Sequence, residues 1–320
     1  MTLLSLVGRL LYRAQLAFAR REGAPEPAWW RRMLCTAARR GREILARRWD
    51  PVIRVAIGKR GLDLPLSHQL PLYLHESESY DRVLPRVAKA MRVAGPLRVI
   101  DVGANVGDTA ALVADAVADV ELLCVEGSAR FFPLLEANVQ RRGIRATCER
   151  SYCGEGDGGI ALSVAEQDGN GRLYTPRSFR PSKGVAREAR LLSLDTLLLG
   201  YPRFRDAELL KTDTEGFDLQ VLRGAREMLV RTRPVLFVEY HPQLLRESHD
   251  DPRGLAPLLT AAGYRHAVAF TNLGRMHSRI DLLQPGAVSG LDADIDSREV
   301  HYFDLLVTPP EREGLLTAVC

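Results

Sequence analysis

The chain has 320 residues, of which 46% are hydrophobic and 26% are charged, and its net charge is +4. This composition is sufficient for a full hydrophobic core and is close to the average of globular proteins, and the absence of internal repeats and low-complexity tracts excludes repeat arrays. Residues 1–50 contain 11 arginines and four acidic residues, a net charge of +7, so the positive charge is concentrated there. We therefore expect one globular domain preceded by a basic extension.

Residues 3–21 predict an amphipathic helix, because apolar side chains recur at helical spacing on one side and arginines lie on the other. An interfacial helix on an anionic membrane, near a lipid-linked acceptor, is one interpretation. Packing against the protein's own domain or against a second copy is the other, and it is favoured because most amphipathic helices face a core. The homo-oligomeric state is left open.

Arginines interrupt every apolar run near the N-terminus well short of the ~20 residues of a membrane-spanning helix, and no secretory signal is evident. We therefore expect a cytoplasmic protein, with peripheral contact at the inner face of the membrane through residues 3–21 as an open alternative. No nucleic-acid-binding motif accompanies the basic segment, so nucleic acid is not expected as a partner.

The next segment predicts a small hairpin, with strands at 52–57 and 62–66, and a helix over about 80–93 that leads into the first central strand. His68 and His75 could line the acceptor pocket, but a surface position is favoured for both. The predicted organisation is a basic helical extension (1–50), a hairpin-and-helix segment (51–95) and a main domain (96–310).

The stretch from Arg98 to Thr109 predicts a strand, a tight turn and the start of a helix. An apolar run ends at an acidic residue, and small or flexible residues follow it. Glycine has no Cβ and asparagine tolerates positive φ, so such a turn lets a ligand approach the backbone closely. The expected cofactor-binding residues of this turn are Asp101, Gly103, Ala104, Asn105 and Gly107.

A second strand, Val120–Val125, ends at Glu126 and Gly127, which are also expected to bind the cofactor. Glu126 follows Gly103 by 23 residues, close to the ~20 at which an acid reaches the ribose hydroxyls of a nucleoside. The turn reads D-x-G-x-N-x-G, which differs from the dinucleotide pattern G-x-G-x-x-G. S-adenosylmethionine has an ammonium group and no phosphate, so Asp101 suits its amino-acid end, directly or through water.

Further motifs follow at K-T-D-T-E-G-F-D (211–218), L-R-G-A (222–225) and V-E-Y-H-P (238–242). With these motifs, the chain resembles the FkbM family of S-adenosylmethionine-dependent methyltransferases over about residues 60–245. The resemblance also includes the turn at 101–109, the pair Val125-Glu126 and the triplet Leu194-Asp195-Thr196. The block at 211–218 is the specific part of this resemblance.

The resemblance implies an α/β fold of the class I methyltransferase type, Rossmann-like, with helices on both faces of a mostly parallel sheet. It also implies transfer of a methyl group to a hydroxyl of a sugar, a glycolipid or a polyketide-type natural product. Strand patterns near 144–150, 265–271 and 301–307 complete seven predicted strands. The glycine- and arginine-rich region 151–190 predicts either a flap over the acceptor or an ordinary insertion.

An alcohol is a weak nucleophile, so a general base is expected at the carboxyl ends of the strands. The candidates are Asp213, His241 and Glu215, with Glu239 beside them. Asp213 ranks first because it ends its strand within the specific block. Glu215 could instead cap a helix that begins at Gly216, and His241, which precedes Pro242, could only shape a turn.

Three alternatives stay open on sequence grounds. Asp213 and Glu239 could supply two of the oxygen ligands of a Mg²⁺ ion, although no metal ligand set is predicted. An NAD-dependent oxidoreductase could use a similar sheet, and a non-catalytic scaffold could retain the fold. The acceptor, a small molecule or glycan, is not identified by the sequence.

Overall fold

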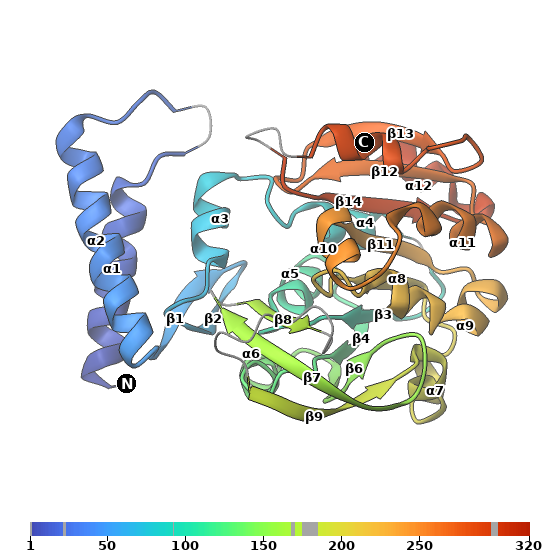
Figure 1. Ribbon diagram of the computed structural model, residues 1–320. Helices are drawn as coiled ribbons and strands as arrows, with labels where there is room; N and C mark the ends of the chain where they lie inside the picture. Colours follow the sequence, from blue (N-terminus) through green and yellow to red (C-terminus); the bar gives the residue numbers. More distant parts are fainter. Residues whose placement is uncertain (1, 22–23, 92, 168–169, 175–184, 296–299) are drawn as a thin grey trace.

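The computed structural model describes the chain apart from residues 1, 22–23, 92, 168–169, 175–184 and 296–299, and the side chains of residues 159–189 also lie outside the description. Within the described residues an α/β body carries a helical hairpin at one edge (Figure 1). No helix of the described residues has both the length and the apolar character needed to cross a membrane.

The central sheet has eight strands in the spatial order β13-β12-β14-β11-β10-β3-β4-β5. The strands are β3 (Leu97–Val102), β4 (Val120–Val125), β5 (Ala146–Glu149), β10 (Leu209–Thr212), β11 (Val235–Tyr240), β12 (His266–Thr271), β13 (Met276–Asp281) and β14 (Phe303–Thr308). β5, β4, β3, β10 and β11 pair in parallel, whereas β14 is antiparallel to both β11 and β12. The predicted mostly parallel sheet is confirmed.

The eighth strand, β13, is the difference from the seven strands predicted. It lies at the edge of the sheet and pairs with β12. Only Ile280 of its six residues is buried, so the segment lacks the apolar run that marks an internal strand. The sequence pattern therefore gave no strand at this position.

Helices cover both faces of the sheet, as predicted. One face carries α4 (Val83–Ala90), α5 (Asp108–Ala116), α6 (Phe132–Arg142) and α12 (Gly314–Val319). The other carries α7 (Leu194–Leu199), α8 (Asp218–Arg223), α9 (Arg226–Arg231), α10 (Pro242–Glu247) and α11 (Leu255–Ala261). Alternate residues of a strand point to opposite faces, so Ile100 of β3 lies in one hydrophobic cluster and Val99 in the other. Short 3₁₀ helices occupy Pro202–Phe204, Pro252–Gly254, Ser289–Ala293 and Pro310–Arg312.

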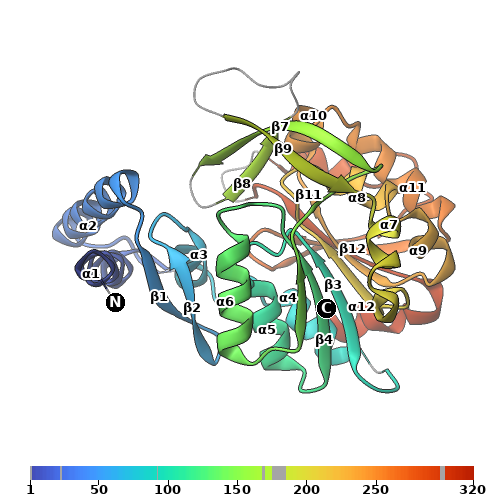
Figure 2. The same ribbon diagram turned by 90° about the horizontal axis from the view of Figure 1, so that it is seen from below.

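The glycine-rich insertion after β5 forms a separate four-stranded sheet outside the central one (Figure 2). Its strands are β6 (Tyr152–Cys153), β7 (Gly158–Gln167), β8 (Asn170–Tyr174) and β9 (Val185–Leu192), in the order β6-β9-β7-β8. The region 151–190 therefore contains strands that form a sheet of their own. Part of the predicted flap, at 168–169 and 175–184, lies outside the described residues.

The N-terminal part contains α1 (Leu3–Phe18) and α2 (Trp29–Arg48), then the antiparallel pair β1 (Val52–Ile57) and β2 (Arg60–Pro65), and then α3 (Leu70–Glu76). The predicted helix and β-hairpin are both present, but Leu3 and Leu10 of the predicted apolar side are exposed, on the same side of the helix as Arg13. Tyr12 of α1 and Leu45 of α2 pack with Ile53 and Leu66 in a small cluster of their own. The helical hairpin of α1 and α2 therefore has its own hydrophobic contact with the β1–β2 segment.

The turn after β3 depends on a glycine at position 103. Gly103 has φ +83°, and a Cβ at this position would lie 1.8 Å from the carbonyl oxygen of Asp213. The backbone N–H of Asp213 donates to the carbonyl of Val102 at 3.1 Å. The turn after β3 and the end of β10 are thus in direct backbone contact, which only a residue without a Cβ allows.

Gly103→Ala should lower the free energy of unfolding by at least about 2 kcal/mol more than Gly95→Ala, measured by urea denaturation. Gly95 is the matched control, because it also has a positive φ (+95°) but a Cβ there would meet nothing within 4 Å. The control separates the backbone strain from the clash. Equal losses in both variants would show that the contact with Asp213 is not a tight one.

Candidate active site

Glu126 ties together the turns that follow β3 and β4. Its Oε2 accepts the backbone N–H of Asn105 at 2.8 Å, and its Oε1 accepts that of Ser128 at 2.7 Å. Asn105 itself adopts a positive φ of 47°. Burial raises the pKa of Glu126 to about 7, and the two backbone donors oppose this rise. The carboxylate therefore holds the turn in shape at the edge of the sheet.

A cavity of about 900 Å³ opens at the carboxyl ends of the central strands. Gly103, Asn105, Glu126 and Gly127 line it, as expected for cofactor-binding residues. Ala104 and Gly107 are not among the described lining residues. Ala104 is buried and Gly107, with φ +84°, precedes α5, so these two residues shape the turn from behind.

Lys211 of β10 lies next to Asp101 of β3 in the parallel register. Its Nζ is 3.1 Å from Asp101 Oδ1 and 3.3 Å from Asp213 Oδ2. Although burial opposes it, the carboxylates of Asp101 and Asp213 hold the pKa of Lys211 well above its usual value. Lys211 is therefore a buried ammonium ion that joins two carboxylates from neighbouring strands.

Asp101 lies in its strand as expected, but its side chain is buried behind the cavity wall. Its residue is 0% exposed, and it is absent from the cavity wall within the described residues. Its position within the strand turns the carboxylate toward Lys211 and away from the open space. A direct contact between Asp101 and a cofactor is therefore not supported, and Asp101 serves to pair Lys211.

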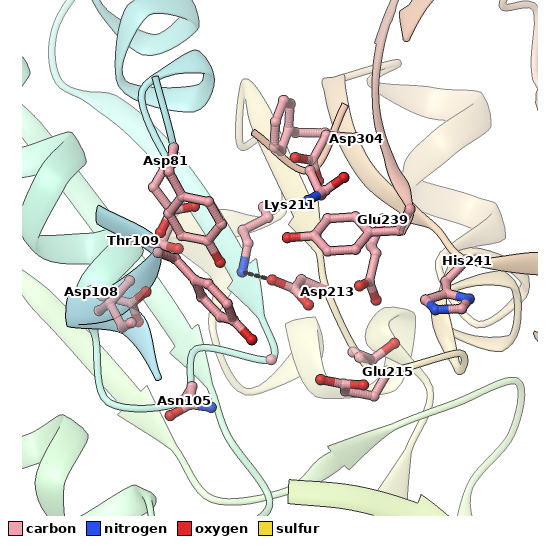
Figure 3. A pocket seen from close by; sticks show the side chains of 18 of the residues that line it. Asp81, Asn105, Asp108, Thr109, Lys211, Asp213, Glu215, Glu239, His241 and Asp304 are labelled. Atoms are coloured by element: carbon pink, nitrogen blue, oxygen red, sulfur yellow. Dashed lines mark ion pairs between the residues drawn. The ribbon is translucent and has the colours of Figure 1, made fainter. Parts of the chain in front are cut away.

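The four candidates for the base converge on the cavity. Asp213, Glu215, Glu239 and His241 all line it, at the ends of β10 and β11 (Figure 3). The side chain of Asp213 is 48% exposed there, while its Oδ2 stays paired with Lys211. Asp213 is thus both accessible to a ligand and held next to a cation.

His241 shows the structural role that was considered, whereas Glu215 does not. The N–H of Leu244 donates to Nδ1 of His241 at 3.5 Å, so His241 caps α10, and its ring stacks on Tyr302. A neutral His241 then carries its proton on Nε2. The N-cap residue of α8 is Phe217, with no side-chain cap, and the carboxylate of Asp218 accepts the N–H groups of Thr214 and Gly216 in the turn before the helix. Helix α8 begins at Asp218, two residues after the expected start.

Sequence reasoning missed several acidic and aromatic residues of this cavity. Asp304 of β14 stands directly opposite Glu239 of β11 in the antiparallel register, and both line the cavity. Burial, together with the nearby Asp213, raises the pKa of both carboxyls well above their usual values. Asp81 also lines the cavity, and burial with the neighbouring Asp108 raises its pKa to about 8. An acid inside the apolar strand 303–308 was the one visible signal, whereas Asp81 lies in an irregular segment that gave none.

The expectation that His68 is a surface residue is wrong. His68 is buried, it lines the cavity, and its Nε2 lies 3.2 Å from Oδ1 of Asn105. Burial lowers the pKa of His68 to about 4, so the ring is neutral at physiological pH. Tyr12 of α1 donates to the carbonyl of His68 at 2.7 Å, which connects the N-terminal hairpin to the cofactor turn.

The acidic side chains do not form a metal centre. Within the described residues, no group of three or more His, Cys, Asp or Glu side chains is placed to hold a metal ion. Asp213 and Glu239, the two ligands considered for Mg²⁺, face a cavity in which Lys211 already provides a cation for Asp213. The geometry therefore does not fit a magnesium site.

The fold and the cavity define an α/β protein with an open cavity at the carboxyl edge of its sheet, where ligands of such sheets bind. The family model "Methyltransferase FkbM domain" matches residues 101–266, which is more than half of the 320 residues. The chain belongs to the FkbM methyltransferase family, and the predicted class I methyltransferase fold is confirmed. S-adenosylmethionine-dependent methyl transfer is the activity that this membership supports.

Solved structures of low sequence identity also match. Methyltransferase FkbM from Methylobacillus flagellatus KT is 17% identical, with a TM-score of 0.42, and the match covers 62% of this chain and 46% of that one. Precorrin-6y C5,15-methyltransferase from Geobacter metallireducens GS-15 is 10% identical, with a TM-score of 0.37 and coverage of 71% and 87%. M. jannaschii TYW2, solved in complex with AdoMet, is 8% identical, with a TM-score of 0.39 and coverage of 80% and 84%. The chain thus spans less than half the length of the first of these proteins, and no curated protein matches it in sequence.

Lys211→Met should lower the free energy of unfolding by about 3–5 kcal/mol, because it leaves Asp101 buried without its counter-ion. In the double variant Lys211→Met/Asp101→Asn the carboxylate is gone, so part of the loss, at least about 1 kcal/mol, should be recovered. Urea denaturation at neutral pH measures both. Lys89→Met, at an exposed lysine of α4, is the control and should change stability by less than about 0.5 kcal/mol. Asp101→Asn alone completes the comparison. A loss in the double variant equal to the sum of the losses in Lys211→Met and Asp101→Asn would contradict the pairing.

Proposed function

We propose that this protein is an S-adenosylmethionine-dependent O-methyltransferase that acts on a hydroxyl of a sugar, a glycolipid or a polyketide-type natural product. One observation carries the proposal. Asp213 contacts the turn at Gly103 through its backbone, and its carboxylate lines the same cavity as Gly103, Asn105 and Glu126. A candidate base and a cofactor-binding turn are therefore side by side.

The residues around the turn fit S-adenosylmethionine. Glu126 reaches the cavity with lone pairs beyond the two that accept backbone N–H groups, so it can accept hydrogen bonds from both ribose hydroxyls. Gly103 also lines the cavity. When bound, the sulfonium of the cofactor supplies an electrophilic methyl group, and the protein's task is to align the acceptor with it, which contributes on the order of 7–11 kcal/mol.

Asp213 is the best placed general base. Its carboxylate is accessible to the cavity, and its Oδ2 lies 3.3 Å from the ammonium nitrogen of Lys211. His241 is less suited, because its Nδ1 already accepts the N–H of Leu244. Glu239 is buried, and burial raises its pKa well above its usual value, which favours the protonated form that can donate a hydrogen bond. Asp213 would accept the proton of the acceptor hydroxyl while Glu239 orients the acceptor.

The wall of the cavity supports an acceptor with several hydroxyl groups. Its side chains beyond the cofactor turn are mainly carboxyl, amide, hydroxyl and imidazole groups, including Asp81, Asp304, Asn272, His301 and Tyr302. Such groups can exchange hydrogen bonds with hydroxyls, whereas a purely apolar acceptor would leave them unpaired at a cost of about 1–3 kcal/mol each. A sugar, free or lipid-linked, suits this wall best.

Asp213→Asn should reduce kcat by about 10²–10⁴-fold and leave the Kd for S-adenosylmethionine unchanged, since it removes only the proton acceptor.

Glu126→Gln should raise the Kd for S-adenosylmethionine by about ten-fold or more, because the carboxylate contact to the ribose is lost. Transfer of a labelled methyl group to a panel of sugars, glycolipids and polyketides, together with calorimetric titration, measures both. Normal turnover in Asp213→Asn would remove Asp213 as the base, and an unchanged Kd in Glu126→Gln would remove Glu126 from the ribose.

A further inference from the structure

The helical hairpin of α1 and α2 exposes an unusual amount of apolar surface. In α1 the exposed large side chains include Leu3, Leu6 and Leu10, and Leu3 is 76% exposed. In α2 they include Trp30, Met33 and Ile44, of which Met33 is 63% and Ile44 67% exposed. Exposed apolar residues scattered singly are ordinary, but a contiguous set marks a surface that binds something.

These side chains form one stripe on each helix. In α1 the exposed positions include Leu3, Leu6, Leu10, Arg13 and Ala17, at spacings of three and four residues. In α2 residues 29–34 are all exposed, and the exposed positions Trp30, Met33, Ala37, Arg40, Ile44 and Arg47 continue along the helix at the same spacing. Residues at this spacing share one face of a helix. Each helix therefore presents apolar side chains and arginines together on a single exposed face.

Both stripes point away from the rest of the protein. Tyr12 of α1 donates to the carbonyl of His68, and Arg42 of α2 donates to the carbonyl of Leu66, so the buried faces of the two helices meet the same segment. Tyr12 and Arg42 lie about half a turn around the helix from Leu10 and Arg40 respectively. The hairpin stands at the edge of the molecule, and the body of the protein lies on its other side (Figures 1 and 2).

We propose that this outer face of the hairpin is a membrane-docking surface for bilayers that contain anionic phospholipid. Apolar side chains, exposed tryptophans and arginines on one face suit the boundary between headgroups and acyl chains. The net charge of +7 over residues 1–50 complements a negatively charged leaflet. A second copy of the chain would instead bring two surfaces of the same charge together, which opposes association.

The connection between the two docking helices reaches the cavity. Arg20 and Arg21, which follow α1 in the connection to α2, are among the residues that line it. Arg20 also pairs with Glu26 across that connection at 2.5 Å. A membrane bound to the hairpin would therefore lie beside the element that contributes to the cavity wall, which suits an acceptor that is carried by a lipid. The docking itself does not depend on the proposed methyl transfer.

Sedimentation of the full chain with vesicles tests the docking without any measurement of activity. The protein should sediment with vesicles of phosphatidylcholine and phosphatidylglycerol, much less with pure phosphatidylcholine, and less as salt increases. Met33→Ser/Ile44→Ser and, separately, Arg40→Gln/Arg47→Gln should each lower the partition coefficient about ten-fold or more. Circular dichroism melting verifies that these exposed substitutions leave the fold intact.

Leu199→Ser/Val230→Ser is the matched control, because these residues are 66% and 58% exposed but lie on the body of the protein. This control should sediment like the unmodified chain. Three results would overturn the proposal: no sedimentation with anionic vesicles, an equal loss in the control variant, or a dimer in light scattering that Met33→Ser/Ile44→Ser dissociates. The last result would assign the face to a second copy of the chain.

Discussion

The ion pair between Lys211 and Asp101 is the constraint around which the site is arranged. Both residues lie inside the central sheet, in register on neighbouring parallel strands, and both are buried. A buried ammonium ion needs a carboxylate partner, and a buried carboxylate needs a cation. Replacing either residue by an uncharged one therefore leaves the other charge buried without a partner, which lowers the stability of the fold. The pair fixes the alignment of β3 with β10 at their carboxyl ends, where the turn at Gly103 and the carboxylate of Asp213 come into contact.

The second constraint is the excess of carboxyl groups over this one lysine. Glu239 and Asp304 face one another across antiparallel strands, an arrangement that is unfavourable if both are ionised. Burial raises the pKa of both well above the usual value, which favours their protonated forms. Positions that break a rule of local stability in this way cluster at functional sites. The carboxyl cluster therefore supports a reaction site in the cavity more than a structural role.

The features that could be predicted from the sequence are the ones encoded within short segments. The turn at 101–109 and Glu126 follow from an apolar strand, glycines at fixed offsets and an acid at the next strand end. The structure brings Gly103, Asn105, Glu126 and Gly127 to one cavity, together with Asp213, Glu215, Glu239 and His241. The order of the motifs along the chain also gave the parallel sheet, because each strand pattern is followed by a helical one.

The features that were missed depend on contacts between distant segments. His68 is buried only because the N-terminal hairpin and the cofactor turn enclose it, and the sequence around it contains no such signal. Asp81 reaches the cavity from an irregular connection, and β13 is a strand because it pairs at an exposed edge. Asp101 has the expected place in its strand, but its partner is a lysine of another strand 110 residues further along the chain. Such pairings become visible only when the strand order is known.

Calorimetric titration of the full chain with S-adenosylmethionine and, separately, with NAD tests the central claim most directly. The turn spacing, Glu126 and the family membership together lead us to expect micromolar binding of S-adenosylmethionine and none of NAD. Binding of NAD alone would contradict the cofactor assignment, and binding of neither ligand would contradict the inference that the cavity beside Gly103 and Asp213 is a cofactor site.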